Sequence, residues 1–170
     1  MAKANNYIDN TVFFEAMCEW KTQIKEAEEV DEGRPPVSNY IGECFVKIAE
    51  HLSYKPNFAN YPFREEMVGD AIENCITYAH NFDPEKSKNP FSYFTQITYY
   101  AFIRRIEKEK KQNFIKFKMM EQLDTDGSMS SWFKHNYFEK TDTKKAMATY
   151  FSLSDNDLDK FTTKNKKKPK

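Results

Sequence analysis

Glycine, cysteine and long apolar runs are scarce in this chain of 170 residues, and each scarcity excludes a class of protein. Its 4 glycines disfavour glycine-rich phosphate loops and β-sandwiches with many tight turns. The longest apolar run, from Tyr99 to Ile103, is far too short to span a bilayer, and residues 1–6 lack the apolar stretch of a secretory signal. We therefore expect a protein of the reducing cytoplasm without a membrane segment.

The residues that usually carry catalysis or bind metals are also few and scattered. The 3 cysteines and 3 histidines lie too far apart in sequence for a zinc site. Cys44 and Cys75 are in phase with apolar helix faces, which favours packing over a nucleophilic role. The adjacent Glu65 and Glu66 diverge by about 100° on a helix and do not converge on a substrate. The sequence therefore predicts no catalytic residue, no metal site and no cofactor.

Aromatic residues, by contrast, are abundant, and charge is unevenly distributed. Phe, Tyr and Trp make up 16% of the chain, which is typical of a folded protein rather than a disordered one. The formal net charge is zero, yet residues 15–32 are strongly acidic, and residues 104–118 and 160–170 are strongly basic. This segregation favours a polyanion on one face of the molecule and a basic protein partner on another.

Apolar residues recur every three or four positions in several segments, which predicts amphipathic helices. We expect these helices over residues 10–30, 38–52, 63–81 and 90–118. Ser38 and Asn89 are the expected N-caps of the second and fourth, and Pro90 suits the first helical position. No alternating strand pattern is present, so the predicted fold class is all-α.

The same patterns predict how the chain is divided. We expect a compact helical bundle over residues 8–118, a flexible polar linker over residues 119–131, and a C-terminal interaction segment over residues 132–170. No internal repeat is visible.

The segment from residue 90 to 118 combines aromatic and basic residues. Its aromatic side chains run directly into Arg104, Arg105 and the lysines that follow. Cationic side chains neutralise phosphates, and aromatic rings stack on bases that have left the duplex. The combination therefore suits nucleic acid. The alternative is that the rings form core and the charges a solvated face, and the residues alone leave the two interpretations about even.

A resemblance favours the first interpretation. The stretch from His80 to Glu109, HNFDPEKSKNPFSYFTQITYYAFIRRIEKE, resembles region 2 of bacterial sigma factors, and more closely the late-transcription sigma factors of T-even-type bacteriophages. The similarity covers roughly residues 20–111 and is strongest from Met67 onward. After Lys118 nothing resembles sigma regions 3 or 4.

The resemblance implies a specific function. It predicts an RNA polymerase sigma factor for phage late genes, which binds the host core polymerase, recognises a minus-ten-like AT-rich promoter element and promotes melting in the cytoplasm of the infected bacterial cell. The alternative is a stand-alone helical protein that binds single- or double-stranded DNA without polymerase. A structural or adaptor protein would be a third class.

The resemblance also implies roles for individual residues. The helix that corresponds to residues 65–81 docks on the β′ clamp helices of the polymerase, which assigns that contact to Glu66, Asp70, Glu73, Asn74 and Thr77. The residues implied to capture unstacked nontemplate bases are Tyr93, Phe94, Tyr99 and Tyr100. Those implied to grip the promoter element are Arg104, Arg105 and Lys108. Housekeeping sigma factors have a tryptophan pair where this chain has Ile97 and Thr98, so Tyr99 or Tyr100 would replace that wedge.

Two further partners come with the family, namely a separate late coactivator and the DNA-loaded sliding clamp. The clamp is reached through a short acidic-hydrophobic motif near the C-terminus, which residues 154–161 resemble, with Leu158 and Phe161 as the implied anchors. The basic stretch of residues 162–170 departs from the family pattern, and its alternative role is nonspecific contact with DNA.

Overall fold

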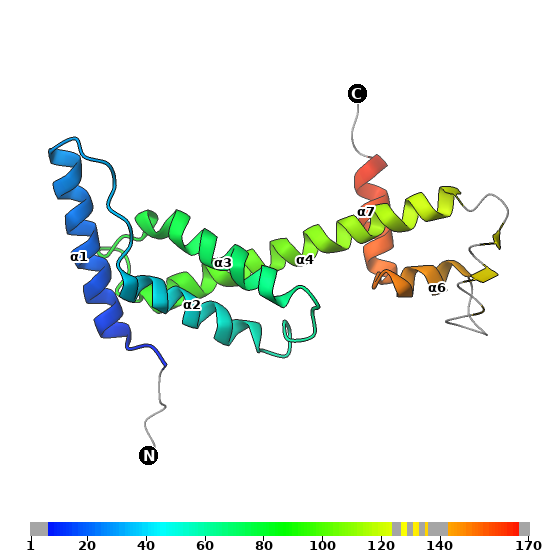
Figure 1. The fold of residues 1–170 in the computed structure, drawn as a ribbon, viewed down its shortest axis with the longest axis horizontal. Coiled ribbons are helices and arrows are strands. Elements are labelled where there is room, and N and C mark those ends of the chain that lie inside the picture. Colours follow the sequence, from blue (N-terminus) through cyan, green and yellow to red (C-terminus); the bar gives the residue numbers. More distant parts are fainter. Residues whose placement is uncertain (1–6, 124–126, 129–130, 133–134, 136–142, 167–170) are drawn as a thin grey trace, which may run out of the picture. The chain divides into compact units, whose positions relative to one another are not determined.

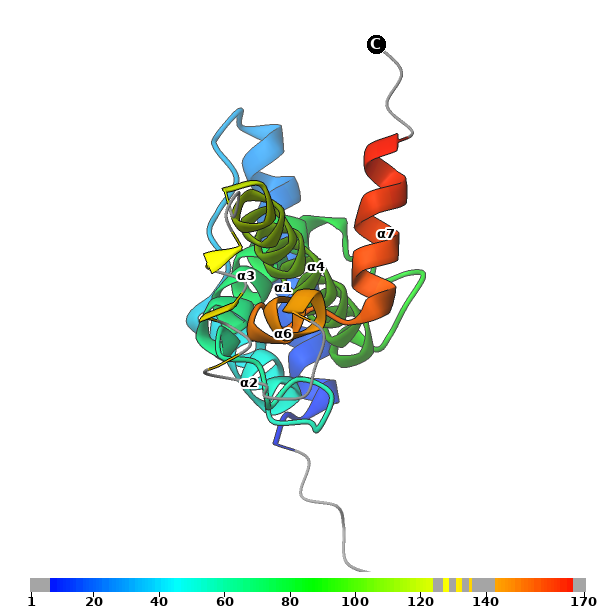
Figure 2. The same cartoon turned by 90° about the vertical axis from the view of Figure 1, so that its right-hand side faces the viewer.

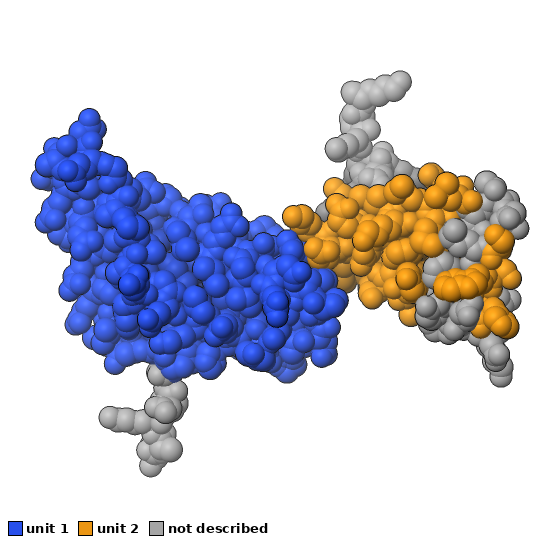
Figure 3. All heavy atoms as spheres, in the orientation of Figure 1, with its two compact units in different colours: residues 1–105 blue, residues 106–170 orange. Residues whose placement is uncertain are grey.

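The computed structural model describes residues 7–123, 127–128, 131–132, 135 and 143–166. These residues form helices and no strand (Figure 1), which confirms the all-α prediction. The chain divides into two compact units, residues 1–105 and residues 106–170 (Figure 3). The boundary falls inside the long helix α4, Pro90–Leu123, so this helix contributes to both units.

Helices of the first unit begin and end close to where the sequence predicts. They are α1 (Asn10–Glu29), α2 (Asn39–Ser53), α3 (Arg64–Tyr78), the 3₁₀ turn η1 (Ala79–Asn81) and the first half of α4. The Ser38 hydroxyl accepts a hydrogen bond from the Ile41 amide at 3.3 Å, and the Asn89 side chain accepts one from Ser92 at 2.9 Å. Both predicted N-caps are therefore confirmed.

The core of the first unit is a cluster of phenylalanine rings supplied by α1, α2, α4 and the segment after η1. Phe94 of α4 lies at its centre, with ring centroids 4.5 Å from Phe45, 5.7 Å from Phe13 and 6.1 Å from Phe82. All four rings are almost wholly buried. Cys75 of α3 packs on the same cluster, and burial raises the pKa of its thiol to about 11. The packing role predicted for Cys75 is therefore confirmed.

The second unit has a small core of its own. The second half of α4 packs with α6 (Thr143–Tyr150) and α7 (Asp155–Lys166), two consecutive helices that Figure 2 shows at a steep angle to each other. Buried residues of this core are Phe114, Phe117, Met147, Ala148, Leu153 and Phe161.

This second core corrects the predicted division of the chain. Helix α4 extends to Leu123, so the first residues of the expected linker, 119–123, are helical. The described residues 143–166 belong to a packed helical unit rather than to a free interaction tail, because their apolar side chains bury one face of α4. Residues 124–126 and 129–130 of the expected linker lie outside the described residues, as do residues 133–134, 136–142 and 167–170 of the predicted C-terminal segment.

Candidate nucleic-acid and protein interfaces

The most exposed aromatic side chains predicted for base capture are Tyr99 and Tyr100 of α4. They are 42% and 52% exposed, and their ring centroids lie 5.7 Å apart in an edge-to-face arrangement. The buried ring of Phe58 contacts Tyr99 edge-on at 5.7 Å. Tyr99 thus rests on a buried ring and on Tyr100, while both tyrosines keep surface that a stacking partner can reach.

A hollow of about 760 Å³ borders these tyrosines. Its walls come from the end of α2 and the first turns of α4, and it is lined by Leu52, Lys55, Asn89, Phe91, Ser92, Thr95, Gln96, Tyr99 and Tyr100. Lys55 and Gln96 add an ammonium group and an amide to the aromatic surface, which suits a nucleotide with a base and a phosphate. The sequence analysis did not single out either residue, because Lys55 reaches the hollow only through the packing of α2 on α4.

Two of the four aromatic residues predicted for base capture are placed differently. Phe94 is fully buried in the core of the first unit, so the prediction that it stacks on bases is wrong. Tyr93 is half-buried, with its ring edge-on to Phe82 at 5.3 Å. Burial raises the pKa of the Tyr93 phenol, which therefore stays protonated. Only a part of the Tyr93 ring is left for a ligand.

The structure brings together residues that were predicted for different partners. The Arg105 guanidinium forms an ion pair with the Asp70 carboxylate at 3.3 Å, and Arg104 donates a hydrogen bond to the Asn74 side chain at 2.8 Å. Both contacts join α3 to α4. The Arg105 side chain is only 16% exposed, and its charge is balanced by Asp70. Arg104 is exposed, and its charge remains because Asn74 is neutral.

The remaining basic residue of the predicted set, Lys108, is exposed one turn after Arg104 along α4. Arg104 and Lys108 are thus exposed, and in the described ion pairs no carboxylate balances their charge. They are the two residues of the predicted basic set that are best placed to contact phosphates.

The outer face of α3 carries the rest of the predicted polymerase contact. Glu66, Glu73 and Thr77 are exposed on this face, and the apolar side chain of Ile76 beside them is 49% exposed. Asp70 and Asn74 face α4 instead, through the contacts described above. The predicted set of five therefore separates into three outward residues and two residues at the junction of the helices.

The residues predicted to anchor the sliding clamp lie in helix α7. Phe161 is buried, with its ring centroid 5.5 Å from that of Phe114, and Leu158 is half-buried against the same core. Both side chains hold α7 on α4, which contradicts their predicted role as anchors for the sliding clamp.

The acidic residues of this motif also have a structural role. Ser154 and Asp157 form a reciprocal cap at the start of α7, in which each side chain accepts a hydrogen bond from the backbone amide of the other at 3.2 and 3.1 Å. The Lys110 ammonium of α4 contacts both carboxylate oxygens of Asp157 at 3.0 and 3.1 Å. The pattern that resembled a clamp-binding motif is thus also that of a helix N-terminus.

Acid is expected to detach α7 from α4. Burial acts to raise the pKa of Asp157, but hydrogen bonds from Ser154 and Lys110 outweigh it, and the net pKa is lowered. Because the folded pKa lies below the unfolded value of about 3.9, this interaction stabilises the unit above that pH, and the stabilisation is lost as the pH falls through the folded pKa. The methyl resonances of Leu153, followed by NMR from pH 6 to pH 2, measure the transition. In Asp157→Asn, the Leu153 resonances should already show at pH 6 part of the shift that acid causes in the original chain. If the variant and the original chain had the same pH dependence, Asp157 would not be the group that holds α7 on α4.

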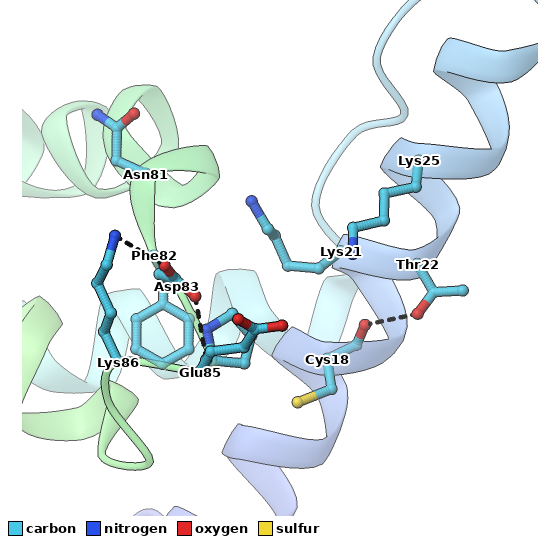
Figure 4. Close-up of a pocket in the computed structure, with 10 residues that line it drawn as sticks. Cys18, Lys21, Thr22, Lys25, Asn81, Phe82, Asp83, Glu85 and Lys86 are labelled. Carbon is cyan, nitrogen blue, oxygen red and sulfur yellow. Dashed lines mark hydrogen bonds and ion pairs between the residues drawn. The ribbon is translucent and has the colours of Figure 1, made fainter.

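A second hollow of the first unit lies between α1 and the segment after η1 (Figure 4). Lys21 donates a hydrogen bond to the His80 carbonyl at 2.9 Å, and Lys86 forms an ion pair with Asp83 at 3.0 Å. Glu85 also lines the hollow. An anion would therefore meet carboxylates as well as ammonium groups, and the hollow contains none of the predicted site residues.

Neither a protein-family model nor a curated protein sequence matches the chain. Among the described residues, no group of three or more His, Cys, Asp or Glu side chains is placed to hold a metal ion. None of the described helices has the length and apolar character needed to cross a membrane.

Proposed function

We propose that this chain is a minimal sigma factor for phage late genes. It brings the host core polymerase to a minus-ten-like AT-rich promoter element and promotes the opening of the duplex in the cytoplasm of the infected cell. The observation that supports this most is the arrangement on α4, where exposed Tyr99 and Tyr100 border a hollow and are followed on the same helix by exposed Arg104 and Lys108.

Each part of this surface has a chemical task in the proposal. The arginine and lysine neutralise phosphates with release of counterions, which provides affinity without sequence preference. The tyrosines stack on bases that leave the duplex. AT-rich steps separate at a low free-energy cost, so the capture of unpaired bases favours AT-rich promoter elements. Lys55 holds the phosphate of a nucleotide seated in the hollow.

The polymerase contact is assigned to the outer face of α3. Glu66, Glu73 and Thr77 present carboxylates and a hydroxyl to a basic surface, and the exposed Ile76 adds an apolar side chain next to Glu73. Protein interfaces usually combine apolar and polar side chains in this way. The proposal leaves out the sliding clamp, because Leu158 and Phe161 pack within the second unit.

Co-elution with bacterial core RNA polymerase in gel filtration, followed by permanganate footprinting on an AT-rich template, tests the proposal. We expect a stable complex and reactive thymines around minus ten only when both proteins are present. Failure to bind core polymerase, combined with salt-sensitive binding to DNA alone, would instead support a stand-alone DNA-binding protein.

The variant Glu66→Lys/Glu73→Lys tests whether the outer face of α3 makes the contact with core polymerase. Reversing two exposed charges should weaken the affinity for core polymerase by about tenfold or more, since charge reversal at an interface costs several kcal/mol. Asp70 is unsuitable for this test because its reversal would also break the ion pair with Arg105. Glu15→Lys, at an exposed site on α1, is the matched control. Equal losses in both variants would remove α3 from the interface.

A further inference from the structure

The second half of α4 has an exposed apolar face that the proposed function does not use. Ile115, Met119 and Leu123 follow one another at intervals of four residues and are 40%, 56% and 70% exposed. We call these three residues the α4 stripe. The buried Phe114 and Phe117, which pack on α6 and α7, belong to the opposite side of the helix. The α4 stripe is therefore a second apolar face, separate from the one that holds the unit together.

Free positive charge flanks the α4 stripe. Lys111 and Lys116 are exposed, and within the described part of the chain neither forms a hydrogen bond or an ion pair. Neighbouring charges are already engaged, since Lys110 contacts Asp157, Lys118 contacts Glu121, and Glu107 contacts Lys160. The net charge offered to a partner along this face is therefore positive.

The combination of the apolar α4 stripe with the basic side chains beside it distinguishes among three possible binding partners. DNA would engage the lysines but would leave the apolar side chains of the α4 stripe in water. A second copy of the chain, paired through the same stripe, would bring its own lysines close to those of the first. A protein segment with apolar residues at helical spacing and acidic residues beside them satisfies both the apolar and the charged parts.

We infer that the α4 stripe is a second contact with core RNA polymerase, made to an acidic amphipathic helix of that enzyme. The inference rests on the proposed function, which supplies this partner. Because α3 and the α4 stripe belong to one chain, occupation of the first contact makes the second intramolecular, and two modest contacts then give a stable complex.

Site-specific photocrosslinking tests the inference with the full chain. A photoreactive phenylalanine analogue replaces Met119 in one variant and Glu73 in another, and each is irradiated with core polymerase and an AT-rich promoter fragment. We expect both positions to crosslink to polymerase subunits, with the Met119 crosslink mapping to an acidic helix. Lys111→Glu/Lys116→Glu should reduce the Met119 crosslink about tenfold, whereas Lys145→Glu on α6 should not.

The other outcomes overturn the inference and are distinguishable. A crosslink from position 73 without one from position 119 rejects the second contact and leaves the proposed function intact. A crosslink from position 119 to promoter DNA alone identifies the surface as a nucleic-acid contact, and one within the chain shows that the protein covers its own stripe. No crosslink to polymerase from either position rejects the proposed function as well.

Discussion

Phe94→Ala is expected to lower the free energy of unfolding of the first unit by about 3–5 kcal/mol, the usual loss for a buried phenylalanine. The ring is fully buried and contacts Phe13, Phe45 and Phe82, so its removal leaves a cavity at the centre of the core. Because small domains are stable by only about 5–15 kcal/mol, the variant should be close to unfolding at physiological temperature.

Urea denaturation followed by Trp20 fluorescence measures this loss. Trp20 is buried in the first unit and donates hydrogen bonds to the carbonyls of Pro35 and Pro36, so its emission reports unfolding there. The experiment uses a Trp132→Phe background, which leaves Trp20 as the only tryptophan.

Tyr100→Ala is the matched control for Phe94→Ala. It removes an exposed ring from the same helix and should change the free energy of unfolding by less than about 0.5 kcal/mol. If Phe94→Ala left the urea midpoint unchanged and impaired only promoter opening, the core role of Phe94 would be rejected in favour of base binding.

The contrast between Phe94 and Tyr100 shows what the sequence could predict. Helix positions and caps depend on local patterns, so Ser38 and Asn89 were identified from neighbouring residues alone. The role of an aromatic residue depends on which side of the helix meets the other helices. Phe94 and Phe102 belong to the residues of α4 that recur every three or four positions, and both are buried, whereas Tyr99 and Tyr100 lie off this set and are exposed. The base-capture role of Phe94 came from the resemblance and not from this periodicity.

The two arginines illustrate a second limit of sequence reasoning. Arg104 and Arg105 are neighbours in a basic stretch and look equivalent, yet one is exposed and the other is largely enclosed against Asp70. The contact joins residues that are 35 positions apart, so no local pattern contains it. Lys110 and Asp157 are also far apart in sequence, and their ion pair attaches the acidic motif of residues 154–161 to α4.

Tyr99→Ala/Tyr100→Ala is expected to reduce promoter opening by about tenfold or more while leaving the affinity for core polymerase within about twofold. Each stacked base contributes about 1–3 kcal/mol, and the two rings are the most exposed of the aromatic residues predicted for this role. The fluorescence of 2-aminopurine placed at the upstream edge of the minus-ten element measures opening, and gel filtration with core polymerase measures assembly.

The conservative variant separates stacking from other roles of these tyrosines. Tyr99→Phe/Tyr100→Phe keeps both rings and removes only the hydroxyl groups, so it should open promoters nearly as well as the original chain if stacking is the main contribution. Loss of opening in this variant would assign the work to hydroxyl hydrogen bonds. Normal opening by the double alanine variant would show that the exposed rings of α4 do not capture bases. The hollow beside these rings would then not be part of the surface that melts the promoter.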